Sequence, residues 1–261
     1  MRANYNGQKM LGYLNMSLLK RFSILLSIVS CVLFLSSTAQ AQLTIEITQG
    51  VDSPVPIAVV PFGVVGQQGA LAEDVSAIIN ADLRRSGLFR PIPQSDMLSF
   101  PRNKYEISFR DWRILGSEYL VIGNVTLKGD KYSLHFELFN ILNQSTVHSQ
   151  TLEAGLDQLR DLAHYAADQV FEKITGIRGV FATQMIYVEA FQNGNINQDK
   201  FRLMLADVDG ARPKLLLESR QPILSPSWSP DGRQVVYVSY ETGRPAIFRQ
   251  ELASQVREQL T

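Results

Sequence analysis

The sequence predicts an α/β N-terminal domain, with a mixed sheet and two long helices, followed by the first, incomplete part of an all-β propeller. Between residues 54 and 179, two amphipathic helical patterns lie among apolar strand patterns. After Gly179 the helical period stops, and short alternating segments separated by Gly, Asn and Pro take over. These segments repeat at an offset of 44 to 50 residues, which is typical of propeller blades. We therefore place the α/β domain at 54–179 and the propeller part at 180–261.

Composition excludes several classes of protein. The chain has 261 residues, with 25 basic and 25 acidic side chains. The first 41 residues hold four of the bases and no acid, so residues 42–261 carry a net charge of −4. A mildly acidic body excludes a protein that binds nucleic acid by general attraction to phosphates. The chain has one cysteine, so it cannot form a framework of disulfide bonds. It has three histidines, which provide few ligands for a metal site, and we expect no metal and no cofactor.

The N-terminus has the pattern of a secretory signal peptide. Two basic residues precede the uncharged apolar stretch Phe22–Leu35, and small residues stand at Ala39 and Ala41. Fourteen residues rise only about 21 Å as a helix, which is too short for roughly 30 Å of hydrocarbon. The pattern predicts a signal peptide at 1–41 that is cleaved after Ala41, and no membrane span after cleavage.

Two alternatives to this cleaved peptide stay open. The apolar stretch could be a membrane anchor with an unusual end, or Cys31 could be lipidated in a loose lipobox. Against lipidation, the four residues after Cys31 would stay apolar. The leader is long, so Met10 or Met16 could be the true start in place of Met1.

Residues 42–53 form a segment of their own at the predicted mature N-terminus. Apolar and polar residues alternate in it: Leu43, Ile45 and Ile47 against Thr44, Glu46 and Thr48. This period of two predicts a strand. An extended segment at a free end can pair with its own domain or with the sheet edge of another protein.

The α/β domain begins with a buried strand and an amphipathic helix. Pro56–Phe62 is a short continuous apolar run, typical of a strand that is buried on both faces. Apolar residues then recur at helical spacing from Leu71 to Leu83. We expect Glu73 and Asp74 in the first turn of this helix, where they complement the helix dipole.

The rest of the domain follows in order. The patterns predict an edge strand at Leu88–Ile92, irregular chain at 93–108, a short helix at Asp111–Leu115, a hairpin of Glu118–Thr126 and Tyr132–Phe139, a strand at Thr146–Leu152 and a second long helix at Leu159–Ile174.

The propeller part contains an internal repeat. Gln184–Val188 matches Gln234–Val238 at an offset of 50 residues, and the second copy has four strand patterns ending at Thr261. Its turn residues have separate structural roles. We expect Pro226 and Pro230 to flank a short strand, Trp228 to pack on a neighbouring sheet, and Asp231-Gly232 to form a tight hairpin turn.

Few residues suit catalysis or metal binding. The chain contains no Gly-x-Ser-x-Gly motif, and we expect His135, His148 and His164 to be structural. Asp207 and Asp209 before a glycine faintly resemble a cation loop, but too few oxygens lie near them for calcium.

The stretch from Ser225 to Thr261 resembles the propeller repeat of the TolB family. Three upstream segments, Ile57–Phe62, Ala81–Arg84 and Val170–Ile177, are similar to TolB segments and occur in the same order. The resemblance implies a signal peptide, an α/β domain and a six-bladed propeller. Such a ring needs about 240 residues, whereas about 80 are present, so we expect a truncated propeller of two blades at most. An open pair of blades leaves an apolar face uncovered, so we expect residues 181–261 to be poorly ordered or to aggregate.

The resemblance also implies a function. It indicates a periplasmic scaffold of the Tol-Pal system, not an enzyme, which links TolA to the peptidoglycan-associated lipoprotein Pal. Such a scaffold supports outer-membrane integrity and constriction in cell division, and colicins exploit it for import. Outer-membrane lipoproteins are further expected partners.

The family's TolA-binding element corresponds to Gln42–Ser53 here. Leu43, Ile45 and Ile47 would form the contact face, with Glu46 steering recognition, and release of the segment from the protein's own domains would act as a switch. The loops that bind Pal would lie mostly beyond Thr261. Gly194–Gln198 and Glu241–Arg244 are candidates by position only, and we expect plain solvent turns there.

Two alternatives to the scaffold stay open. Serine peptidases of the prolyl-oligopeptidase type share such propeller repeats, and this chain could be the N-terminal part of one, with its catalytic domain beyond residue 261. A binding module with an unrelated ligand is the second alternative.

Overall fold

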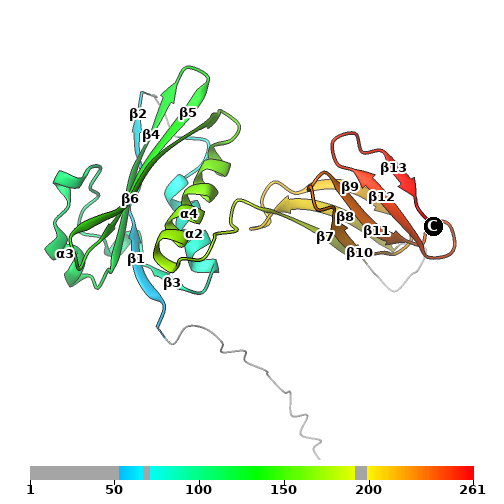
Figure 1. Ribbon diagram of the computed structural model, residues 1–261, viewed down its shortest axis with the longest axis horizontal. Helices are drawn as coiled ribbons and strands as arrows, with labels where there is room; N and C mark the ends of the chain where they lie inside the picture. The colour runs from blue at the N-terminus through cyan, green and yellow to red at the C-terminus, as the bar shows by residue number, and fades with distance from the viewer. Residues whose placement is uncertain (1–52, 67–70, 192–198) are drawn as a thin grey trace, which may run out of the picture. The chain divides into compact units, whose positions relative to one another are not determined.

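The computed structural model describes residues 53–66, 71–191 and 199–261 (Figure 1). The first part of this region folds around one mixed sheet, with strand order β3-β1-β4-β5-β6 and β2 paired to β4 outside this path. The strands are β1 Val55–Val59, β2 Gly63–Val65, β3 Phe89–Pro91, β4 Tyr119–Lys128, β5 Lys131–Asn140 and β6 Ser145–Gly155.

The sheet is parallel on one side and antiparallel on the other. β1 runs parallel to β3 and β4, and β2 also runs parallel to β4. β4, β5 and β6 form an antiparallel meander. The predicted mixed sheet, edge strand and hairpin are therefore confirmed. β2 was not predicted, because three residues are too few to show a period.

Strand alternation gives the sheet two apolar faces, and each is covered. Ile57 and Val59 of β1 pack in the same core as the helices α2 (Val75–Arg85) and α4 (Leu159–Thr175). Ala58 and Val60 point to the other face, where they pack with Trp112 of α3 (Phe109–Ile114). Figure 1 shows α2 and α4 on one face of the sheet and α3 on the other.

The first helix starts later than its apolar period predicts. Asp74 is not in the first turn: it is the N-cap, and its side chain accepts a hydrogen bond of 3.0 Å from the Ala77 N–H. Leu71 and Glu73 consequently lie before α2, since a capping residue has extended rather than helical dihedrals. Because Glu73 lies outside the helix, its side chain can reach Arg160 of α4.

The segment predicted as irregular contains two single turns of 3₁₀ helix. They are Gln94–Asp96 and Lys104–Glu106, and the Asn103 side chain caps the second. The second long helix is confirmed: α4 ends at Gly176, whose positive φ of 73° closes the last turn.

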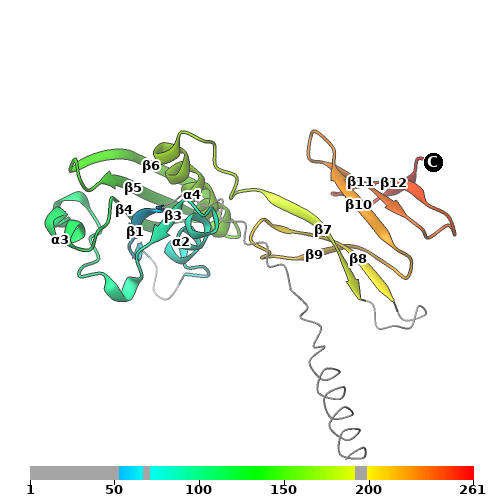
Figure 2. The same ribbon diagram turned by 90° about the horizontal axis from the view of Figure 1, so that it is seen from below.

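The propeller part forms two antiparallel sheets (Figure 2). One has the order β7-β8-β9 and the other β10-β11-β12-β13, which confirms the predicted four-stranded blade. The strands are β7 Gln184–Phe191, β8 Lys200–Asp207, β9 Lys214–Ser219, β10 Ile223–Trp228, β11 Gln234–Ser239, β12 Ala246–Glu251 and β13 Arg257–Gln259.

One core joins the two sheets. Leu203 and Leu216 of the first sheet pack with Val235 and Tyr237 of the second. The buried Gln250 of β12 donates a hydrogen bond of 3.2 Å to the Leu216 carbonyl, which crosses between the sheets. The two sheets are therefore consecutive blades of a partial propeller. The expectation that residues 181–261 are poorly ordered stays a prediction.

Pro226 lies inside a strand and not at its flank. β10 already begins at Ile223, and its register with β11 shifts between Leu224 and Ser227. Ser225, at a φ of 51°, and Pro226 occupy this bulge. A bulge leaves residues without ladder hydrogen bonds, so the missing N–H of proline costs no pairing there.

Several predictions fall outside the described residues. These are the signal peptide 1–41 with Ala39 and Ala41, the strand at Leu43–Thr48, and the loop Gly194–Gln198. Among the residues that are described, no helix has the length and apolar character needed to cross a membrane.

Candidate functional site

Four polar residues of α4 lie on one side of the helix. Arg160, Asp161, His164 and Asp168 recur at intervals of one, three and four residues, which places them along one stripe. The apolar residues of α4, such as Ala163 and Val170, face the sheet. The stripe contacts two segments. One is the 207–212 turn, which connects β8 and β9, and the other is the chain that leads into β7.

Arg160 is held by carboxylates from two other elements. Its Nε donates to Asp207 Oδ2 at 3.3 Å, its Nη1 donates to Glu73 Oε2 at 3.3 Å, and its Nη2 donates to Asp209. The Arg160 side chain is only 14% exposed, so these charges interact in a partly dehydrated setting. One guanidinium thus connects α4, the 207–212 turn and the residue before the α2 cap.

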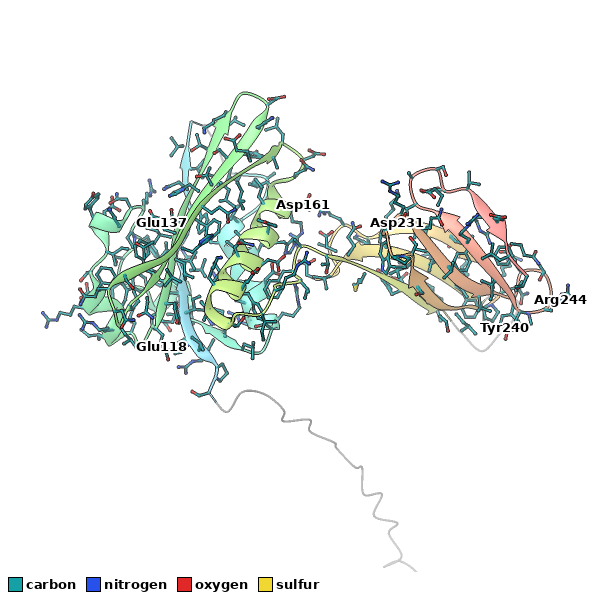
Figure 3. All side chains as sticks on the ribbon, in the orientation of Figure 1. Glu118, Glu137, Asp161, Asp231, Tyr240 and Arg244 are labelled. Atoms are coloured by element: carbon teal, nitrogen blue, oxygen red, sulfur yellow. The ribbon has the colours of Figure 1, made fainter. Side chains whose placement is uncertain are left out.

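Arg212 makes the reciprocal contact, from the turn to the helix. It donates to both oxygens of Asp207, at 2.8 and 3.0 Å, and to Asp161 of α4. The hydrogen bond to Asp207, followed by the one to Asp161, raises the pKa of Arg212 above its usual value. Figure 3 shows Asp161 on α4.

Asp168 anchors the chain that enters the propeller part. Its carboxylate accepts hydrogen bonds from the backbone N–H groups of Phe181, at 2.6 Å, and Ala182, at 3.1 Å. Burial raises the pKa of Asp168 even though both hydrogen bonds oppose the shift. Gly179 lies against this carboxylate: a Cβ there would come within 2.5 Å of the Asp168 Cα.

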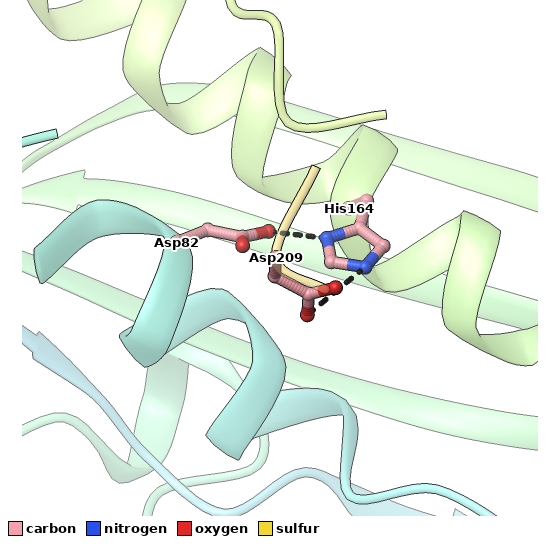
Figure 4. A group of neighbouring side chains, drawn as sticks. All are labelled: Asp82, His164 and Asp209. Atoms are coloured by element: carbon pink, nitrogen blue, oxygen red, sulfur yellow. Dashed lines mark hydrogen bonds and ion pairs between the residues drawn. The ribbon is translucent and has the colours of Figure 1, made fainter. Parts of the chain in front are cut away.

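His164 lies between two carboxylates (Figure 4). Its Nδ1 is 2.6 Å from Asp82 Oδ2, and its Nε2 is 3.8 Å from Asp209 Oδ2. Asp82 also accepts a hydrogen bond of 2.7 Å from Arg85. An ionised carboxylate only accepts, so His164 carries a hydrogen at Nδ1, and its Nε2 has no hydrogen-bond partner among the described residues.

The surroundings of Asp209 favour its ionised form. Burial alone would raise its pKa, but a hydrogen bond from the Ala211 N–H and the charges of Arg160, His164 and Arg85 together hold the pKa below its usual value. The cluster formed by Glu73, Asp82, Arg160, Asp161, His164, Asp207, Asp209 and Arg212, here called the α4–turn cluster, therefore works as a network of opposite charges.

The residues of the cluster do not fit a metal ion well. Asp82, His164 and Asp209 could each offer one ligand atom, and these atoms lie within 4.8 Å of one another. Asp82, however, is bonded to the imidazole Nδ1, and Arg160 already neutralises Asp209. Asp207 and Asp209, which faintly suggest a cation loop in the sequence, are partnered by arginines here.

A cavity of about 620 Å³ lies beside the cluster. Its lining includes Asp161, His164, Asp207, Arg212, Trp228 and Gly232. Two of the predicted repeat residues, Trp228 and Gly232, therefore line the same cavity as polar residues of the cluster, which come from other parts of the sequence.

The remaining repeat residues shape the β10–β11 turn. Asp231 Oδ1 accepts from Ser229 Oγ at 2.6 Å and from the Arg233 N–H at 3.1 Å, and the first of these bonds lowers the pKa of Asp231. Gly232 has a φ of 69°, which suits a tight turn. Figure 3 shows Asp231 at this turn, which follows Pro230.

Sequence reasoning missed the central residues of the cluster. Arg160 and Arg212 were not singled out, and His164 was expected only to be structural. The available signal was the run Asp207-Val208-Asp209-Gly210, which was interpreted as a weak cation loop. Paired with the stripe of charges on α4, it could have suggested an ion-pair contact.

Comparison with known proteins gives a consistent result. The family model described as the TolB amino-terminal domain matches residues 43–147, and the one described as the TolB beta propeller domain matches residues 171–261. The Tol-Pal system protein TolB of Marinomonas sp. (strain MWYL1) is 49% identical over 233 residues, which cover 88% of this chain and 53% of the relative. The protein of the same name from Pseudomonas entomophila (strain L48) is 44% identical over 94% of this chain and 55% of its own length.

A solved structure agrees with the fold. The crystal structure of TolB from Acinetobacter baumannii aligns with a TM-score of 0.71 and 32% identity, over 83% of this chain and 51% of that one. The chain thus spans about half the length of the curated relatives that it matches.

The fold defines a class: an α/β domain whose second long helix is fastened by ion pairs to the first sheet of a propeller. The chain belongs to the TolB family. This family is a non-enzymatic component of the Tol-Pal system, which confirms the prediction that the chain is not an enzyme.

Proposed function

We propose that this protein is a periplasmic scaffold of the Tol-Pal system that links TolA to Pal. The observation that carries the proposal is its similarity to Tol-Pal proteins over 94% of the chain. In this role it supports outer-membrane integrity and constriction in cell division. Colicins and outer-membrane lipoproteins are further proposed partners, and nucleic acid is not one.

The proposal divides the chain by role. Residues 1–41 direct export and are removed, residues 42–53 bind TolA, and 54–179 and 180–261 form the α/β domain and the propeller part. Mass spectrometry of the protein from a periplasmic fraction tests the first step, because cleavage after Ala41 leaves Gln42 as the first residue. A protein that retains residues 1–41, or a lipid on Cys31, would contradict it.

TolA recognition is assigned to one face of residues 43–48. In an extended segment, Leu43, Ile45 and Ile47 lie on one side, and Thr44 and Thr48 on the other. An apolar ridge beside free backbone donors and acceptors suits strand addition to a partner's sheet edge.

Calorimetric titration with the periplasmic domain of TolA tests this assignment. We expect the triple substitution Leu43→Ser, Ile45→Ser and Ile47→Ser to weaken binding at least tenfold, because it removes the apolar contact face. The matched control, Thr44→Ser with Thr48→Ser, alters the opposite face and should bind as the unmodified protein does. Unchanged affinity of the triple variant, with unchanged thermal unfolding, would contradict the assignment of this face to TolA binding.

Glu46 is proposed to steer the encounter. Its charge acts at long range, so Glu46→Gln should slow association and reduce its salt dependence while dissociation changes little. Stopped-flow mixing with TolA at two salt concentrations measures both rates.

A further inference from the structure

The α4–turn cluster contains one gap in its hydrogen bonding, between His164 and Asp209 (Figure 4). The imidazole Nε2 is buried, has no partner among the described residues and points toward Asp209 Oδ2 at 3.8 Å. A neutral imidazole with its hydrogen on Nδ1 presents a lone pair at Nε2. A lone pair and a carboxylate face each other there with no hydrogen between them.

Charged groups of both signs lie around His164. The groups that face it come from α2, from α4 itself, from the chain before α2 and from the 207–212 turn. The acidic groups of these elements are Glu73, Asp82, Asp161, Asp168, Asp207 and Asp209, and the basic groups paired with them are Arg85, Arg160 and Arg212; Asp82 and Asp209 lie against the imidazole itself. Asp82 and Asp209 thus offer carboxylate oxygens on the two nitrogen sides of the imidazole ring.

We propose that His164 is a proton-operated latch, which fastens the 207–212 turn to α2 and α4 when it binds a second proton. The proton comes from solvent and forms an N–H bond at Nε2. The imidazolium then donates to Asp82 from Nδ1 and to Asp209 from Nε2. Loss of that proton removes the bond to Asp209 and leaves the bond to Asp82 in place.

The neighbouring contacts make this a modulating latch and not the sole tie. The guanidinium groups of Arg160 and Arg212 stay charged at all physiological pH values, and Asp168 of α4 accepts backbone hydrogen bonds from Phe181 and Ala182. The lowered pKa of Asp209 keeps that carboxylate ionised and able to accept a hydrogen bond. Among the side-chain types of the cluster, histidine is the one that ordinarily gains or loses a proton between pH 5 and 8.

The cavity beside the cluster gives the proton a route. His164 is among the residues that line this space of about 620 Å³, although its side chain is only 2% exposed. Water in such a polar space can exchange protons with Nε2 without unfolding of either element.

Distance measurements between spin labels test the latch in the full chain. Cys31→Ser removes the native thiol, and Asp130→Cys and Arg244→Cys place labels on exposed turns of the α/β domain and of the propeller part. We expect a narrow distance distribution at pH 5.5 and a broader one at pH 8. The ratio of docked to undocked molecules should fall by about tenfold, the effect of losing one charge-assisted hydrogen bond.

Matched variants separate the latch from general effects of pH. His164→Gln cannot bind the second proton and should give one distribution at both pH values. His148→Gln changes a half-buried histidine of β6 that bonds to Gln150, and it should respond to pH as the unmodified protein does. A pH response that survives in His164→Gln, or no response in the unmodified protein, would overturn the proposal.

Nitrogen NMR of the side chains gives a readout that a structural role alone would not move. The chain has only three histidines, so ¹⁵N-histidine spectra can be assigned with the single glutamine variants. We expect His164 to pass from the Nδ1–H tautomer to the doubly protonated form over the pH range of the distance change. A His164 that stays in one form, or a distribution that narrows on adding Zn²⁺ at fixed pH and broadens with chelator, would contradict a proton latch; the second result would indicate a metal ion in the gap.

Discussion

Gly179 is the residue at which side-chain size is most restricted next to the cluster. An added Cβ would lie 2.5 Å from the Asp168 Cα and 2.7 Å from its Cβ, and neither backbone nor Cβ atoms can move away cheaply. The helix and the chain entering the propeller part would have to separate.

Gly179→Ala should therefore destabilise the protein by about 1–3 kcal/mol, the usual cost of overpacking. Urea unfolding measures this change. Gly155→Ala is the matched control, because its Cβ would meet only the flexible ends of Asp157 and Gln158, at 3.0 and 3.4 Å. Equal loss of stability in the two variants would show that the contact with Asp168 is not responsible.

Asp209 of the cluster and Asp168, the α4 residue that anchors the chain into the propeller part, should respond to pH in opposite directions. The pKa of Asp209 is lowered by folding, so its charge stabilises the fold above the unfolded pKa, and this contribution is lost as pH falls through the folded pKa. The pKa of Asp168 is raised, so the penalty for ionising it in the fold grows as pH rises above the unfolded pKa.

Asp209→Asn should accordingly cost about 1–3 kcal/mol at pH 7 and much less at pH 3. Asp168→Asn also loses a hydrogen bond, but its cost relative to the unmodified protein should shrink as pH rises from 3 to 7. Urea unfolding at several pH values gives both slopes. Slopes of the same sign for the two variants would show that the assigned environments are wrong.

Among the elements, α2 depends on a cap that the sequence pattern placed inside the helix. Asp74 accepts from the Ala77 N–H at 3.0 Å and from the Ser76 hydroxyl at 2.6 Å. The first of these bonds satisfies an N–H group that has no partner within the helix.

Asp74→Ala should cost about 1 kcal/mol of unfolding free energy, whereas Asp74→Ser should restore most of it, because serine can accept the same backbone hydrogen bond. Thermal unfolding of the two variants provides the measurement. If serine were no better than alanine, the carboxylate would act through its charge alone.

The elements also show what the sequence could predict. The long period of α4 and the ten-residue strands β4 and β5 were predictable, because each repeats its pattern several times. β2 has three residues, and the position of Pro226 depends on a bulge set by the partner strand, so neither has a local signature. The cluster depends on Arg160 meeting Asp209, a contact across 49 residues that no local period encodes.

At the scale of the whole chain, the two tryptophans report on separate parts. Trp112 is buried beneath the sheet of the α/β domain, and Trp228 packs at the edge of the core shared by the propeller sheets. The α4–turn cluster supplies ion pairs between these parts, so we expect it to couple their unfolding.

Arg160→Met should separate the two unfolding transitions. Each tryptophan is followed by its fluorescence in a single-tryptophan background (Trp112→Phe or Trp228→Phe). The unfolding transition reported by Trp228 should then have its midpoint at a lower urea concentration than the transition reported by Trp112. Arg202→Met is the matched control, because Arg202 pairs with Glu218 inside one sheet, at 2.7 Å. Transitions that stay coincident in Arg160→Met would show that the cluster does not transmit stability.

Both sides of α4 are in use, and this restricts how its sequence can vary. One side fills the core of the α/β domain, and the other holds the polar stripe. Within the helix, only Tyr165 and Lys173 are largely exposed to solvent. A library of all single substitutions should therefore accept a wide range of residues at these two positions and few elsewhere along the seventeen residues of the helix. We therefore expect evolutionary substitution in this helix to concentrate at Tyr165 and Lys173.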